Sequence, residues 1–149
     1  GATYKYEFLA PFSNYGEKMV DVAAPGMLIH STIPGDEYLD VSGTSQAAPY
    51  VANVAARIKD INPSLTPKEI KEIIMGTVDE KSYLASKIKT KGIVNMDRAA
   101  FAANLSLTNP VSSSINRASS EVADVKISNI KSNYNFNEIF VLPLTSMFK

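Results

Sequence analysis

The feature that most constrains this 149-residue chain is an apolar helical segment at 45–61. Asn62 and Pro63 end the segment, and Pro49 falls in its opening turn, where a missing N–H costs little. A helix that is apolar on nearly every side belongs in a protein interior and not on its surface. Most positions of the segment are small or apolar: Ala47, Ala48, Val51, Ala52, Val54, Ala55, Ala56 and Ile58.

The turn that leads into this helix places hydroxyl groups at a helix N-terminus. Gly43, Thr44 and Ser45 stand directly before the alanine-rich run. The first turn of a helix carries unpaired N–H groups and the positive end of the helix dipole. Two interpretations follow. Thr44 or Ser42 caps a structural core helix, or Ser45 attacks a carbonyl carbon while a nearby N–H faces the oxyanion that forms.

The octapeptide at 42–49 is more specific than a capped helix requires. It reads Ser-Gly-Thr-Ser-Gln-Ala-Ala-Pro and resembles the nucleophile signature of the subtilisin-like serine proteases. On that resemblance Ser45 is the nucleophile, and Gln46 stands where the family usually has methionine. Three further segments resemble family motifs in the same order, at 1–3, 10–16 and 20–26.

The resemblance covers residues 1–104 and implies an α/β fold with a parallel sheet between helices in three layers. The chain would form only the C-terminal portion of that catalytic domain. In subtilisin the triad runs in the order Asp, His, Ser, and a side-chain asparagine lies in the oxyanion hole. We therefore expect the aspartate, the histidine and the asparagine to precede residue 1. The expected partners are a polypeptide substrate and this N-terminal part of the domain.

His30 is the only histidine, so it is the one candidate for a general base within the chain. The family has a variable residue at the matching strand position and its catalytic histidine lies far upstream. We therefore interpret His30 as a structural or surface residue. The predicted function is that of a serine endopeptidase with an Asp-His-Ser triad. Of this triad only Ser45 lies in this chain, so the chain alone would be inactive. The alternative is a non-catalytic binding or structural module that keeps the fold.

Composition excludes several other classes. The chain has no cysteine, and its 15 basic and 15 acidic residues leave no formal net charge. Thiolate chemistry is therefore absent, and no basic excess favours nucleic acid or an anionic membrane. No apolar run is long enough to span a bilayer. No cofactor or metal is expected for the chemistry. The resemblance implies a secreted or cell-envelope protein and a weak structural calcium site near Asp21, although a surface strand aspartate is the alternative.

The remaining segments predict packing elements. Thr66, Pro67 and Glu69 form a capping-box start for a helix ending near Gly76. Asn95 is the expected cap of a helix at 96–104. Residues 105–149 are expected to be separate from the protease-like part. Serine-rich 106–120 predicts a linker, and the apolar runs at 125–127 and 139–142 predict strands of an incomplete β module.

Overall fold

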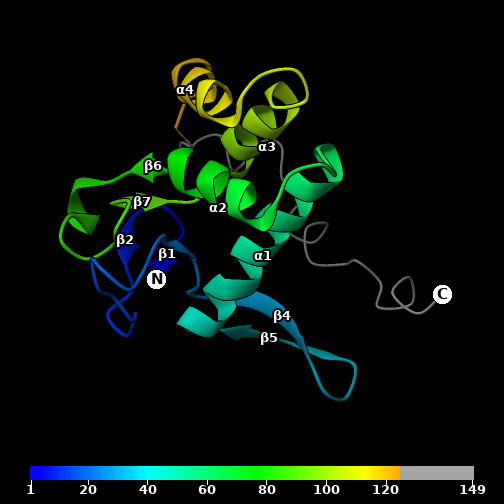
Figure 1. The fold of residues 1–149 in the computed structure, drawn as a ribbon. Coiled ribbons are helices and arrows are strands. Elements are labelled where there is room, and N and C mark those ends of the chain that lie inside the picture. The colour runs from blue at the N-terminus through cyan, green and yellow to red at the C-terminus, as the bar shows by residue number, and fades with distance from the viewer. Residues whose placement is uncertain (125–149) are drawn as a thin grey trace.

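The computed structural model describes residues 1–124, and the predicted strands at 125–127 and 139–142 lie outside them. Helix α1 crosses the middle of the molecule, with α2, α3 and α4 gathered towards its C-terminal end (Figure 1). A short 3₁₀ turn follows α2 at Ser82–Leu84. None of the helices in this part of the chain is long and apolar enough to cross a membrane. The helices are α1 Thr44–Ile61, α2 Pro67–Gly76, α3 Met96–Leu105 and α4 Val111–Glu121.

The strands are short and pair in a mixed pattern. In the first sheet β1 lies between β2, which is antiparallel to it, and β3, which is parallel. A parallel bridge from Ala23 to Ile93 joins this sheet to the antiparallel pair β6–β7. The pair β4–β5 forms a separate antiparallel ribbon. The strands are β1 Ala2–Tyr4, β2 Phe8–Leu9, β3 Ala24–Pro25, β4 Ile29–Ile33, β5 Glu37–Val41, β6 Asp79–Glu80 and β7 Gly92–Ile93.

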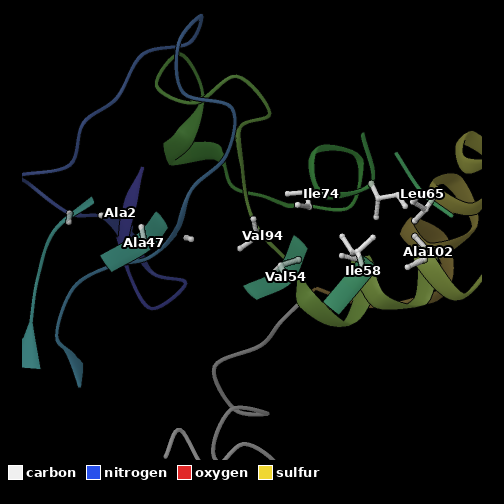
Figure 2. Packing of buried hydrophobic residues seen from close by; sticks show 14 residues of the cluster. Ala2, Ala47, Val54, Ile58, Leu65, Ile74, Val94 and Ala102 are labelled. Carbon is white, nitrogen blue, oxygen red and sulfur yellow. The ribbon is translucent and has the colours of Figure 1, made fainter. Parts of the chain in front are cut away.

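The hydrophobic core lies where α1 meets the sheet on one side and the later helices on the other (Figure 2). Near its start, Ala47 belongs to the same cluster as Ala2 of β1. Towards its end, Val54 and Ile58 share the cluster with residues of α2 and α3. Helices packed against strands confirm the predicted α/β class, and α1 is the element that the other elements contact most widely.

The described residues cover only part of α1, whose apolar sequence predicts a place in a protein interior. Ala47, Val54 and Ile58 are buried, whereas Ala48, Ala52 and Ala56 are exposed. The three exposed positions are four residues apart, so they lie along one face of the helix. In a sequence, a run of alanines suggests a buried helix. Exposing an alanine costs little free energy, however, because its side chain has a small apolar surface.

Both predicted helix starts are confirmed. Thr66 caps α2, with its Oγ1 accepting from the Glu69 N–H at 3.3 Å and its own N–H donating to Glu69 Oε2 at 2.8 Å. Asn95 caps α3 by accepting the Arg98 N–H at 2.9 Å. Each cap joins residues three apart, which makes it readable from sequence alone.

The predicted linker at 106–120 is wrong, because most of it forms α4. Ser114 and Ala118 are buried, four residues apart on one face. Ile115 packs so closely on α2 that a Cβ added to Gly76 would lie 2.7 Å from its Cγ2 atom. Serine content suggested a loose segment, but the spacing of these three residues is that of a helix with one packed face. The packed body therefore continues past residue 104.

Candidate active site

The turn before α1 is held by backbone contacts rather than by a capping side chain. Gly43 is the N-cap, with φ 168° and ψ 164°, and no side chain caps the helix. The proposed caps are therefore not used: Ser42 Oγ accepts the Leu28 N–H at 2.9 Å, and Thr44 is the first helical residue. The Gly43 N–H donates to the Gly26 carbonyl at 2.7 Å, which ties the turn to the end of β3.

Gly26 itself leaves no room for a side chain beside this turn. An added Cβ would lie 2.7 Å from the Gly43 oxygen and 2.8 Å from the Ala2 Cβ. The close approach brings the end of β3 directly against the start of α1. Packing thus explains the glycine at position 26, since glycine alone allows this contact.

Ser45 is the second residue of α1 and is exposed. The first N–H groups of a helix lack the usual partner four residues back, and here the Gln46 N–H donates to the Gly43 carbonyl at 3.1 Å. A hydroxyl at this position is accessible to a substrate and lies beside donors that favour a developing negative charge. The structure thus leaves the Ser45 hydroxyl exposed at the start of α1, and its role as a nucleophile stays a prediction.

The Gln46 side chain folds back over the turn. A Cβ added to Gly43 would lie 2.6 Å from Gln46 Oε1, so the carboxamide covers the Gly43 Cα. A larger residue at position 43 would require the Gln46 carboxamide to move aside.

His30 is not connected to Ser45 by any hydrogen bond in the described part of the chain. It lies on the exposed β4–β5 ribbon, which projects from the body (Figure 1). Its Nδ1 atom contacts Asp40 Oδ1 at 2.9 Å, and its ring stacks on Tyr38 with centroids 5.3 Å apart. These contacts support the interpretation of His30 as a surface residue, because they stabilise pairing across the ribbon.

Two tyrosines near α1 are also unsuited to act as bases. The hydroxyls of Tyr6 and Tyr50 lie 3.2 Å apart, and both side chains are partly buried. Burial raises the pKa of Tyr6 and the pKa of Tyr50 above their ordinary values, so both remain neutral near pH 7. This pair is a packing contact between α1 and the loop after β1.

Two lysine side chains contact the carboxylate of Asp21. Its carboxylate contacts the Lys71 ammonium at 2.8 Å and the Lys89 ammonium at 3.5 Å. The hydrogen bond from Lys71 lowers the pKa of Asp21. No cluster of three metal-ligating side chains occurs within residues 1–124. Because both ammonium groups contact the carboxylate oxygens, a calcium ion bound at Asp21 would have to displace Lys71 and Lys89.

A buried polar network was missed by sequence reasoning. Arg98 on α3 is almost fully buried, and its guanidinium lies 3.4 Å from Asp79, which is completely buried. Asn95 Nδ2 donates to the same carboxylate at 2.7 Å. A lone arginine within a run of buried alanines was the available signal. None of these residues belongs to the turn around Ser45, so the network is structural.

Comparisons with known proteins identify the family of the chain. The Subtilase family model matches residues 1–101. Subtilisin Savinase of Lederbergia lenta is 37% identical over 99 residues, covering 66% of this chain and 36% of that protein. The thermostable alkaline protease of Halalkalibacterium halodurans is 41% identical over 91 residues, covering 60% of this chain and 24% of that protein. The chain thus spans about a third or less of the curated relatives that it matches.

Solved structures give the same fold. The A-subunit of the AB5 toxin from E. coli matches with a TM-score of 0.58 at 30% identity, covering 60% of this chain and 29% of that one. A structure of the subtilase cytotoxin SubAB assembly matches with a TM-score of 0.59 at 24% identity, covering 78% of this chain and 35% of that one. With the family model matching well over half of its residues, the chain belongs to the subtilase family.

Proposed function

We propose that this chain is the nucleophile-bearing part of a serine endopeptidase. The observation that carries the proposal is the exposed Ser45 on the first turn of α1, within a segment that the family model matches. Treatment of the complete protein, translated from the full gene, with a fluorophosphonate probe tests it. The proposal expects a single adduct, at Ser45, together with hydrolysis of a denatured protein substrate.

The reaction is acyl transfer to water. Ser45 Oγ attacks the peptide carbonyl carbon while a histidine from outside this chain accepts the hydroxyl proton. The Ser45 N–H helps to stabilise the oxyanion. The histidine then gives the proton to the leaving amine, and an acyl-enzyme on Ser45 remains. Water, deprotonated by the same histidine, releases the acid product and restores the hydroxyl. No cofactor is needed for these steps.

The histidine, its aspartate and the oxyanion asparagine are proposed to lie in an N-terminal part of the catalytic domain. That part is the proposed partner of the exposed alanine face of α1. Two observations support this arrangement: His30 is engaged with Asp40, and the matched relatives are about three times as long as the matched segment. We further propose that the protein acts outside the cytoplasm or in the cell envelope, as the resemblance implies.

Residues 1–149 alone are expected to hydrolyse no peptide. A neutral serine is a poor nucleophile without an adjacent base, and His30 is not in contact with Ser45. Turnover of a fluorogenic peptide by this segment measures the effect, and the complete protein is the positive control. Activity of the isolated segment that disappears in His30→Ala would refute the expectation and make His30 the base.

The alternative function is a non-catalytic subtilase module. It is favoured by the contacts of His30, which leave Ser45 without a base among residues 1–124. The coding sequence upstream of Gly1 separates the two proposals. An in-frame family histidine, aspartate and asparagine supports the protease, whereas their replacement supports the module.

Gln46 is expected to make the complete enzyme resistant to peroxide. Methionine beside a nucleophile oxidises to a polar sulfoxide, whereas a carboxamide has no sulfur to oxidise. Residual activity is measured over time in peroxide for the wild type and for Gln46→Met. We expect slow loss in the wild type and much faster loss in the variant. Equal rates in both proteins would show that position 46 does not control oxidative inactivation.

A further inference from the structure

The loop at 10–16 is firmly attached next to the nucleophile turn. Ser13 is buried, its Oγ accepting the Ala2 N–H at 2.7 Å and donating to the Asn14 carbonyl at 2.9 Å. The Ser13 N–H donates to the Ala10 carbonyl, and the Gly16 N–H donates to the Lys87 carbonyl at 2.7 Å. The backbone of Asn14 is therefore fixed relative to β1, although its side chain is exposed.

From this fixed position the Asn14 carboxamide reaches the turn before α1. Its Nδ2 atom donates to Thr44 Oγ1 at 3.4 Å, across 30 residues of sequence. Thr44 immediately precedes Ser45 and follows Gly43, which provides no capping side chain. The hydrogen bond is long and exposed to solvent. It is a side-chain contact that links the loop to the residue next to the nucleophile.

We propose that Asn14 is a positioning residue for Ser45, acting through Thr44. This inference rests on the proposed peptidase function. Because Thr44 Oγ1 accepts from the carboxamide, its own proton is directed away from Asn14, and the Thr44 side chain is restrained to one orientation. With no cap on the helix, this restraint limits how far the Thr44–Ser45 backbone can rotate. The donors of the first turn then stay aligned with the oxyanion as it forms.

The chemistry of the carboxamide distinguishes this role from simple packing. Asparagine donates through Nδ2 and carries no charge. Aspartate has the same shape but can only accept, and it would place a negative charge beside a turn that must stabilise an oxyanion. A structural surface residue would tolerate this change, whereas a positioning residue would not. Asn14→Asp should therefore be more harmful to turnover than Asn14→Ala.

The test is a double-mutant cycle in the complete protein with a fluorogenic peptide. Asn14→Ala and Thr44→Val are each expected to lower kcat about three- to tenfold with KM nearly unchanged, as for loss of one hydrogen bond. The double variant should be no slower than Thr44→Val alone, because both changes remove the same interaction. Asn14→Asp should lose more than Asn14→Ala. Asn109→Ala is the matched control, since its exposed carboxamide bonds to Leu105 on another part of the surface.

Three results would overturn the inference: an unchanged kcat in Asn14→Ala, a change confined to KM, or additive losses in the double variant. Thermal melting is recorded for every protein, and Asn14→Ser replaces Asn14→Ala in the cycle if the latter unfolds. Labelling of Ser45 in the wild type distinguishes a failure of the proposed peptidase function from a failure of the role of Asn14. A wild type that neither labels nor hydrolyses contradicts the proposed function. A wild type that does both, with full kcat in Asn14→Ala, contradicts only the role of Asn14.

Discussion

Ser45→Ala is expected to lower kcat of the complete protein by about 10⁶-fold, the loss known for removal of one triad residue in subtilisin. The reason is that nucleophile and base act as one unit, so removing the hydroxyl leaves nothing for the base to activate. Residual hydrolysis would come from binding and from the oxyanion donors alone. Substrate binding should change little, since the alanine leaves the first turn of α1 in place.

Ser112→Ala provides the matched control for this experiment. Ser112 is exposed and is the second residue of α4, just as Ser45 is the second residue of α1. We expect full activity and full fluorophosphonate labelling for Ser112→Ala, and neither for Ser45→Ala. Retained peptidase activity in Ser45→Ala, or an adduct that maps to another serine, would remove Ser45 from the mechanism.

The largest expected effect on stability comes from Arg98. Its Nη1 donates to the Val78 carbonyl at 2.8 Å, and its Nε and Nη2 both donate to the Val122 carbonyl. The same guanidinium faces the carboxylates of Asp79 at 3.4 Å and Asp124 at 2.9 Å. A single buried side chain thus joins the end of α2, the start of β6 and the chain that follows α4.

Arg98→Met keeps most of the side-chain volume and removes all five of these contacts. We expect a loss of about 3–5 kcal/mol in the free energy of unfolding, because the change leaves a buried carboxylate facing an apolar group. Denaturant unfolding of the complete protein, followed by circular dichroism, measures this loss. The reaction itself should be affected only through the folded fraction, since Arg98 belongs to no part of the Ser45 turn.

Arg117→Met is the control, because Arg117 forms an ion pair with Glu121 at 2.6 Å while remaining more than half exposed. An exposed pair of this kind contributes about 1 kcal/mol or less. Comparable losses in the two variants would show that burial does not set the importance of Arg98. A negligible loss in Arg98→Met would mean that the network around Asp79 relaxes without it.

Local patterns were read correctly where the interaction lies within one helical turn. The Thr66–Glu69 capping box and the Asn95 cap were predictable because each links residues three apart. The family resemblance was recognised from eight consecutive residues at 42–49, and the family model matches a range that contains them. In α4 the same kind of local information was present, but serine composition outweighed the helical spacing of Ser114, Ile115 and Ala118.

The sequence by itself determined the family, the extent of α1 to within a residue and the identity of the candidate nucleophile. Tertiary structure alone decided what surrounds them. Asp21 meets Lys71 and Lys89, Arg98 meets Asp79, and Asn14 meets Thr44 across 19 to 68 residues of chain. Such pairs depend on how separate elements pack, so no spacing rule encodes them. The exposure of one face of α1 has the same origin, because burial is a property of the neighbours and not of the helix.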